Sequence, residues 1–180
     1  MPVGRRNFLL GSLGGVTTLT PLGRAGRALG TTADAHTLAF YHIHTAETLK
    51  ITYREQGTLV PGALEEIKHF LRDFRTAQKH DIDVALLDEL YRLYAEFDHR
   101  GNFEVISGYR SPRTNAALRH VTSGVAENSL HISGRAIDVR LTSATTKDLR
   151  DAAIALQCGG VGYYPESNFV HVDTGAFRTW

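Results

Sequence analysis

The chain has a single cysteine, Cys158, among its 180 residues, and this scarcity limits its chemistry. One cysteine excludes an intramolecular disulfide and also a Cys-x-x-Cys zinc site. The residues before it, Ala-Ile-Ala-Leu-Gln, form an apolar stretch of helical character. Such surroundings favour an inert buried thiol over a catalytic nucleophile.

The chain also lacks a large excess of either positive or negative charge. The formal net charge is +1, charged residues make up 22% of the chain and hydrophobic residues 42%. Four arginines and one aspartate lie in residues 1–35, so residues 36–180 carry 16 basic and 18 acidic side chains, a net charge of −2. This composition is that of one folded domain with a core of its own. A domain with this charge has no obvious nucleic-acid footprint.

The N-terminal segment, residues 1–35, resembles an export signal. Arg5 and Arg6 precede a short apolar run that is rich in glycine and threonine. Paired arginines in this position are typical of the twin-arginine route, which exports folded proteins, and residues 33–35 fit a small-x-small cleavage site. The apolar run is too short and too glycine-rich to span a membrane well. We therefore expect an exported domain, residues 36–180, in the periplasm or cell wall, without stable membrane insertion.

The remaining pattern predicts an α+β domain in which helices pack on a small antiparallel sheet. Apolar and polar residues alternate as they do in strands, and apolar residues elsewhere recur at helical spacing. Ser111 followed by Pro112 is typical of a helix start. The predicted elements are a hairpin over 38–54, helices over 61–77 and 83–97, a strand at 103–107, a helix from Pro112, a strand at 136–141, a helix over 146–156, a turn at 159–162 and a strand at 169–173.

An aspartate in a predicted strand, Asp138, raises the question of what neutralises it, because a buried carboxylate is costly unless it is paired. Strand alternation places Asp138 on the face opposite its apolar neighbours, and it does the same for His171 and Asp173. If the two strands are adjacent, Asp138 and His171 meet, and His131 lies just before the first strand. Two imidazoles and one carboxylate suit a catalytic zinc, whose charge would offset that of the carboxylate. From spacing alone, pairing of Asp138 with an arginine is an equally good interpretation.

A longer motif around these residues resembles a known family. Ser129-x-His131-x-x-Gly134-x-Ala136-x-Asp138 matches the S-x-H-x-x-G-x-A-x-D signature of the LAS-type metallopeptidases. These include the D-alanyl-D-alanine carboxypeptidases and dipeptidases, and they share their fold with the hedgehog signalling domain. Residues 107–112, Ser-Gly-Tyr-Arg-Ser-Pro, resemble the segment that supplies the family's arginine. Residues 162–175 are similar to the exported branch typified by murein endopeptidase K.

The resemblance implies roles for individual residues. His131, Asp138 and His171 would hold Zn²⁺, although such an open site also accepts other divalent metals. The catalytic arginine would be Arg110, which would bind a substrate carbonyl or carboxylate and stabilise developing negative charge.

The identity of the general base is left open by the sequence. Relatives place an acidic residue or a histidine three positions before the last ligand, where this chain has Asn168, which cannot take a proton. Asp173 shares the strand face of His171 and is the favoured catalytic candidate, although orienting His171 is an alternative role for it. Glu166, or attack without a dedicated side-chain base, are the other options.

The resemblance implies a zinc-dependent murein endopeptidase that hydrolyses amide bonds in the stem-peptide cross-links of peptidoglycan. Cross-links that join two diaminopimelate residues are the most specific expectation, and a monomer is assumed. Two alternatives remain, a D,D- or L,D-carboxypeptidase or dipeptidase acting on free stem ends, and a non-catalytic zinc-containing module that binds peptidoglycan.

Overall fold

The computed structural model describes residues 34–121 and 124–180. The predicted export signal falls almost entirely outside these ranges, so the signal, its route and its cleavage site remain predictions. In the part of the chain that the structure describes, no helix combines the length and the apolar character needed to cross a membrane.

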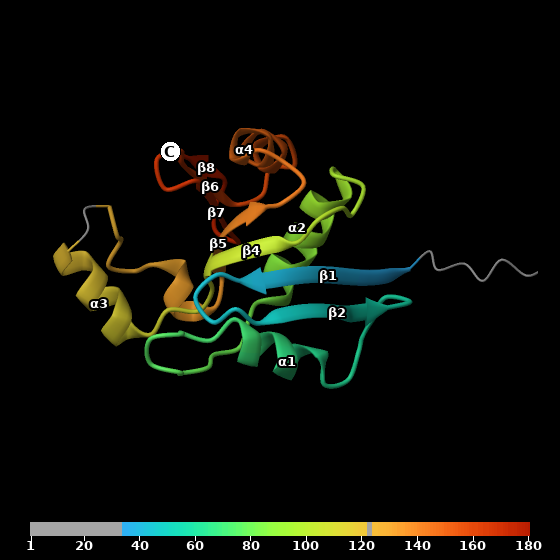
Figure 1. The fold of residues 1–180 in the computed structure, drawn as a ribbon, viewed down its shortest axis with the longest axis horizontal. Helices are drawn as coiled ribbons and strands as arrows, with labels where there is room; N and C mark the ends of the chain where they lie inside the picture. The colour runs from blue at the N-terminus through green and yellow to red at the C-terminus, as the bar shows by residue number, and fades with distance from the viewer. Residues whose placement is uncertain (1–33, 122–123) are drawn as a thin grey trace, which may run out of the picture. The chain divides into compact units, whose positions relative to one another are not determined.

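The described chain forms a single β-sheet with helices packed on it (Figure 1). In chain order, the elements are β1 (Ala35–His42), β2 (Thr48–Glu55), β3 (Thr58–Leu59), α1 (Ala63–Phe70), α2 (Val84–Ala95), β4 (Phe103–Ser107), α3 (Pro112–Val121), the 3-10 helix η1 (Leu130–Ser133), β5 (Ala136–Leu141), α4 (Thr146–Ala155), β6 (Gly160–Tyr164), β7 (Phe169–Asp173) and β8 (Arg178–Thr179). This arrangement confirms the predicted α+β class.

The sheet is larger than predicted and is mixed rather than purely antiparallel. Its eight strands lie in the order β3-β2-β1-β4-β5-β7-β6-β8. The central pairs β4–β5, β5–β7 and β7–β6 are antiparallel, whereas β1–β4 and β6–β8 are parallel. A parallel pair needs a long crossover, and the segment that contains α1 and α2 supplies it between β1 and β4. The expected hairpin is confirmed as β1 and β2.

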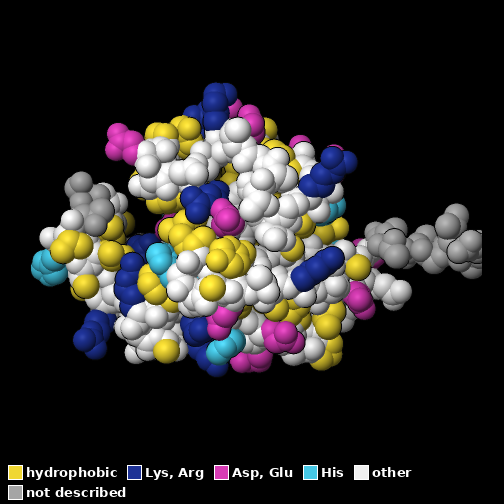
Figure 2. All heavy atoms as spheres, viewed as in Figure 1, with side chains coloured by type: hydrophobic (Ala, Val, Ile, Leu, Met, Phe, Trp, Pro, Cys, Tyr) yellow, Lys and Arg dark blue, Asp and Glu magenta, His cyan; other side chains and the backbone are white. Residues whose placement is uncertain are grey.

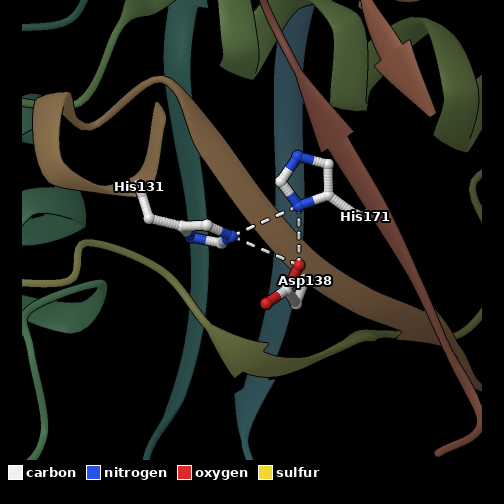
Figure 3. Close-up of side chains that lie close together, drawn as sticks. All are labelled: His131, Asp138 and His171. Carbon is white, nitrogen blue, oxygen red and sulfur yellow. Dashed lines mark hydrogen bonds and ion pairs between the residues drawn. The ribbon is translucent and has the colours of Figure 1, made fainter. Parts of the chain in front are cut away.

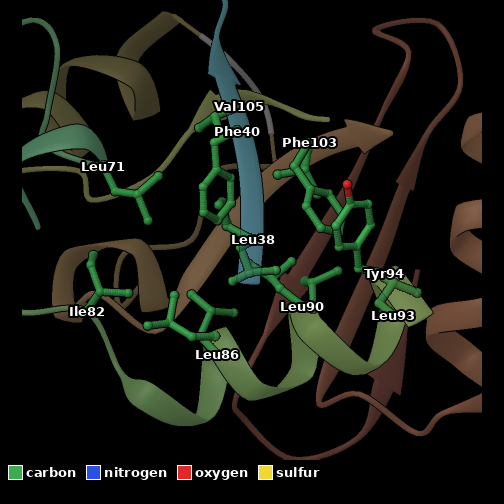
Figure 4. Close-up of a cluster of buried hydrophobic side chains, with 14 of the residues drawn as sticks. Leu38, Phe40, Leu71, Ile82, Leu86, Leu90, Leu93, Tyr94, Phe103 and Val105 are labelled. Carbon is green, nitrogen blue, oxygen red and sulfur yellow. The ribbon is translucent and has the colours of Figure 1, made fainter. Parts of the chain in front are cut away.

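The hydrophobic core lies between one face of the sheet and the helices α1, α2 and α4. Residues two apart along the strands point into it, as Leu38 and Phe40 of β1 and Val170 and Val172 of β7 do, each no more than 2% exposed. Helix α2 packs its apolar side chains, among them Leu86 and Leu90, against β1 (Figure 4). Because successive side chains of a strand alternate between faces, the polar residues between these positions lie on the opposite face. That face carries the candidate site.

The predicted helix over 61–77 is shorter in the structure, since α1 ends at Phe70. The carbonyl of Leu71 accepts the backbone N–H of Tyr109 at 2.8 Å, and the buried carboxylate of Asp73 accepts the backbone N–H of Ser111 at 2.9 Å. These tertiary hydrogen bonds take the place of a further helical turn. They also fix the loop between β4 and α3, which carries Arg110.

The predicted turn at 159–162 is largely a strand, because Gly160–Tyr164 forms β6 between β7 and β8. Its glycines suggested a turn in the sequence. In the structure they supply space on the sheet face instead, since Gly160 lies against the side chain of Arg178 and Gly162 against that of Trp180.

The start of α3 agrees with the prediction. The hydroxyl oxygen of Ser111 accepts the backbone N–H of Thr114 at 3.2 Å, and Pro112 is the first helical residue. Helix α3 lies apart from the other helices, at the left of Figure 1. On the face shown in Figure 2, basic and acidic side chains are interspersed, without a large patch of one sign.

Candidate metal centre

Strands β5 and β7 bring two of the three predicted ligands together. They are antiparallel neighbours, and their register pairs Asp138 directly with His171. Both side chains are buried and both lie on the face opposite the core. The adjacency on which the sequence argument depended is therefore present in the fold.

The third residue, His131, comes from η1, the short 3-10 helix that precedes β5. This helix ends at Gly134, whose φ of +66° is a left-handed conformation that side chains disfavour. The turn at Gly134 directs the chain into β5, so His131 and Asp138 lie on one local unit. One donor atom each from His131, Asp138 and His171 lie within 4.8 Å of one another, as Figure 3 shows.

In each imidazole, the ring nitrogen that points away from the other two residues is hydrogen-bonded to an acceptor. Nδ1 of His131 lies 2.8 Å from the carbonyl oxygen of Gly108, which can only accept, so this nitrogen carries the proton. Nε2 of His171 donates in the same way to the Asp173 carboxylate at 2.9 Å. Outer hydrogen bonds of this kind set the tautomer of metal-binding histidines.

With both rings neutral, as metal binding requires, the other ring nitrogens present lone pairs to one another and to a carboxylate. His131 Nε2 lies 3.2 Å from His171 Nδ1, and Oδ1 of Asp138 lies 2.8 Å from the latter and 3.3 Å from the former. Three such acceptors need a positive charge between them, supplied either by a proton on His171 or by a metal cation. Two imidazoles and one carboxylate fit a divalent metal of the zinc type.

The titration behaviour of the site agrees with this view. Burial disfavours the charged form of His171, but hydrogen bonds with Asp138 and Asp173 outweigh it and raise its pKa from 6.5 to about 9. Burial likewise opposes ionisation of Asp138, yet His131 and His171 hold its pKa below the ordinary value. The surroundings thus favour a positive charge at the point where the three residues meet.

Arg110 lies beside this group, on the loop between β4 and α3. Its Nη2 is 3.3 Å from Oδ2 of Asp138, the carboxylate oxygen that faces away from the histidines. The other side-chain contacts of Arg110 are long, 3.4 Å to Ser107 and 3.5 Å to Asn115, and its Nε–H has no partner among the described residues. A buried guanidinium with weakly used donors retains capacity to bind an oxyanion. The predicted arginine is therefore adjacent to the predicted ligands, and it also pairs with Asp138, the alternative that spacing left open.

The three candidates for a general base lie in different surroundings. Asn168, at the position that relatives use, is exposed and accepts a hydrogen bond from Thr146 at the start of α4. Glu166 is exposed in the turn between β6 and β7 and does not line the cavity described below.

Asp173 is fully buried behind His171, and five donors already occupy its carboxylate. Oδ2 accepts from Nε2 of His171 and from Arg178 at 2.6 Å. Oδ1 accepts from the backbone N–H groups of Gly160 and Gly175 and from Arg178 at 3.1 Å. Burial raises its pKa, but these donors outweigh burial and hold the pKa below its usual range. This environment is suited to orienting His171.

A cavity of about 490 Å³ opens over the three-residue group. Its lining includes the polar residues Arg110, Asn128 and Ser129 and a group of aromatic residues, called here the aromatic wall. The aromatic wall consists of Tyr164, Phe169 and Trp180. Sequence interpretation missed Arg178 and Trp180, which line this cavity. The signal available for them was their spacing of two, which matches that of Gly160 and Gly162.

An α+β domain with this site on the open face of its sheet is a metallopeptidase domain of the LAS type. Residues 30–180 match the family model described as peptidoglycan L,D-endopeptidase MepK, and the chain belongs to this family. The peptidoglycan L,D-endopeptidase MepK of Escherichia coli (strain K12) is 41% identical over 143 residues, 79% of each chain. The probable peptidoglycan L,D-endopeptidase MepK of Haemophilus influenzae is 40% identical over 171 residues, 94% of this chain and 92% of the relative.

Proposed function

We propose that this chain is a zinc-dependent peptidoglycan endopeptidase in which His131, Asp138 and His171 hold the metal. The observation that carries the proposal is the convergence of three acceptor atoms beside a buried arginine, in a cavity large enough for a peptide segment. When bound, the metal would polarise the scissile carbonyl and lower the pKa of the attacking water.

Arg110 binds and orients the substrate. Its guanidinium pairs with Asp138, and its backbone is held by the hydrogen bond from its own N–H to the carbonyl of His131 at 3.1 Å. A fixed cation beside the scissile carbonyl stabilises negative charge that develops on its oxygen, and it is already in position before the reaction begins.

We assign Asp173 to positioning rather than to proton transfer. Its carboxylate is buried, has five hydrogen-bond donors and holds the outer nitrogen of His171. Glu166 and Asn168 lie away from the cavity lining. Among the described residues that line the cavity, no free carboxylate or histidine remains, which favours attack on the carbonyl without a dedicated side-chain base.

The substrate is a cross-linked stem peptide of peptidoglycan. The printed names of the relatives specify an L,D-endopeptidase, and a bond that joins two diaminopimelate residues links an L-centre to a D-centre. Peptidoglycan lies outside the cytoplasmic membrane, so this substrate agrees with the export predicted from residues 1–35 and with a periplasmic or cell-wall location.

Product analysis on purified sacculi tests the proposal. The zinc-loaded protein is expected to convert cross-linked dimers into monomers, whereas a carboxypeptidase would release only terminal residues and a binding module would release nothing. His131→Ala and Asp138→Ala are expected to lose both zinc and cleavage, because each removes a ligand. His69→Ala, on the exposed face of α1, serves as the matched control. Full zinc content and full activity in either ligand variant would refute the assignment.

A further inference from the structure

Two side chains from the last strand lie in spaces left by two glycines of the neighbouring strand. Strands β6 and β8 are parallel, and their register pairs Gly160 with Arg178 and Val161 with Thr179. A Cβ atom at Gly160 would lie 2.5 Å from Nη1 of Arg178, and one at Gly162 would lie 2.6 Å from Cε2 of Trp180. The glycines therefore let Arg178 and Trp180 lie flat across β6.

These two side chains lie on the same face of the sheet as the proposed metal ligands, in register with them across the neighbouring strands. The register of β7 pairs His171 with Gly162 and Asp173 with Gly160. Because these glycines have no side chains, Trp180 contacts His171 across Gly162, with ring centroids 5.3 Å apart. Arg178 likewise donates to the carboxylate of Asp173 across Gly160. The segment from Arg178 to Trp180 is therefore part of the wall of the active-site cavity.

Trp180 is held firmly for a residue that is half-exposed. Its backbone N–H donates to Val161, its carbonyl accepts from Tyr163, and its indole N–H donates to the hydroxyl of Tyr164 at 2.8 Å. The guanidinium of Arg178 lies 5.0 Å from the indole ring centroid. Even so, 51% of Trp180 remains exposed. An immobilised aromatic side chain with a free apolar face is a typical binding anchor, because little conformational entropy is lost when a ligand covers it.

The charges in the cavity indicate what covers this face. Its two carboxylates are each paired with an arginine, Asp138 with Arg110 and Asp173 with Arg178. Among the described residues, no lysine or glutamate lines the cavity. A guanidinium has five N–H donors, so each paired arginine keeps donors for a further carboxylate, and an aliphatic side arm that ends in a carboxylate suits an aromatic surface in the same cavity.

We propose that Trp180 contacts the substrate and determines specificity, packing its exposed indole face against the aliphatic, carboxylate-bearing side arm of a stem-peptide residue next to the scissile bond. This inference rests on the proposed peptidase function. It identifies the aromatic wall as the subsite that distinguishes such an arm from a short side chain such as that of alanine.

Trp180 is the only tryptophan of the chain, so its fluorescence reports on this subsite alone. Zinc-free protein is titrated with a purified muropeptide dimer, and binding is measured in parallel by calorimetry. The emission of Trp180 is expected to shift to shorter wavelength and to become less sensitive to acrylamide, because the ligand covers the indole. Binding detected by calorimetry with unchanged emission would overturn the proposal.

Variants then separate contact from stability. Trp180→Ala is expected to raise the KM for the dimer by about tenfold with kcat nearly unchanged, as expected for loss of a binding anchor. Trp180→Phe keeps an aromatic face and is expected to recover most of this loss. Gly162→Ala is expected to reproduce the effect of Trp180→Ala, since its Cβ displaces the indole. Phe177→Ala, which removes a half-exposed ring outside the cavity lining, is the matched control.

The outcomes distinguish this inference from the proposed function. An unchanged KM in both Trp180→Ala and Gly162→Ala, in a protein that still cleaves dimers, would refute the subsite and leave the peptidase intact. Failure of the unaltered, zinc-loaded protein to cleave any muropeptide would refute the peptidase itself. If Trp180→Ala does not fold, the emission of the unaltered protein and the kinetics of Gly162→Ala decide the question.

Discussion

The buried carboxylate of Asp73 is predicted to stabilise the fold and the loop that carries Arg110. Asp73 follows α1 and is 2% exposed. One carboxylate oxygen accepts from the backbone N–H and the hydroxyl of Ser111, at 2.9 and 2.6 Å, and the other accepts from the backbone N–H of Arg75 at 2.9 Å. Since Ser111 directly follows Arg110, these bonds fix the arginine's backbone.

The magnitude follows from the titration of Asp73. Burial raises its pKa, but the hydrogen bonds from Ser111, Thr114 and Arg75 outweigh burial and lower the pKa from 3.8 to about 2. At about 1.36 kcal/mol per pKa unit, this corresponds to roughly 2 kcal/mol of folding free energy. Because the pKa is lowered in the folded state, the stabilisation is present above about pH 4 and is lost as the pH falls towards 2.

Replacement of Asp73 by asparagine is therefore expected to lower the free energy of unfolding by about 2 kcal/mol at neutral pH. Each carboxylate oxygen faces an N–H donor, and the amide NH₂ of Asn cannot accept, so one buried donor loses its partner. The difference from the unaltered protein should shrink as the pH falls below about 4. The kcat/KM for muropeptide dimers should fall as well, with zinc content preserved, because Arg110 is displaced.

Urea unfolding followed by circular dichroism, on zinc-free protein at several pH values, measures the difference without a contribution from metal loss. The matched control is Asp81→Asn in the same segment between α1 and α2. Asp81 is exposed, and in the part of the chain that the structure describes its carboxylate pairs with Lys68 alone, so its replacement should change stability little. Equal stability of Asp73→Asn and the unaltered protein at neutral pH, or a loss that does not diminish in acid, would refute the reasoning.

Three further predictions concern single residues. Arg110→Lys keeps the positive charge but loses the planar guanidinium, so kcat should fall by about 10²–10³ with zinc content unchanged. Steady-state kinetics and metal analysis measure both quantities, and an undiminished kcat would contradict the assigned role. Gly134→Ala should lower the melting temperature more than Gly57→Ala, because both glycines have positive φ but only the first would press a Cβ on the carbonyl of Asp81; equal shifts would contradict this. Burial raises the pKa of Cys158 to about 11, so its thiol should react with iodoacetamide in urea but not in the native protein at neutral pH; fast native labelling would contradict the buried position.

Local patterns predicted the elements whose own sequence carries a clear alternation, helical spacing or capping residue. The hairpin of β1 and β2, the strands β4, β5 and β7 and the cap at Ser111 follow from alternation and capping, and the structure confirms them. The predictions failed where tertiary contacts outweigh local preference. Leu71 and Asp73 bond to the loop before α3 and end α1 early. Similarly, β6 is a strand because β7 and β8 pair with it on both sides.

The candidate site shows the same division. The motif from Ser129 to Asp138 is local, and strand parity correctly placed Asp138 and His171 on the face away from the core. Strand alternation gives only the face on which a side chain lies. It could not distinguish a carboxylate that acts as a general base from one that orients a metal ligand. Asp173 shares the face of His171 but lies behind its ring, because Arg178 and two backbone N–H groups hold its carboxylate there.

The sequence by itself determined the class of the protein, since the spacing of a few residue types is enough to define the metal motif and the alternation of its strands. Only the tertiary structure decided what surrounds the motif. The pairing of β5 with β7, the contact of Arg110 with Asp138 and the placement of Trp180 over Gly162 all join residues far apart in the chain. Such contacts depend on strand order and register, which no local pattern encodes, because they arise only when the whole sheet has assembled around its core.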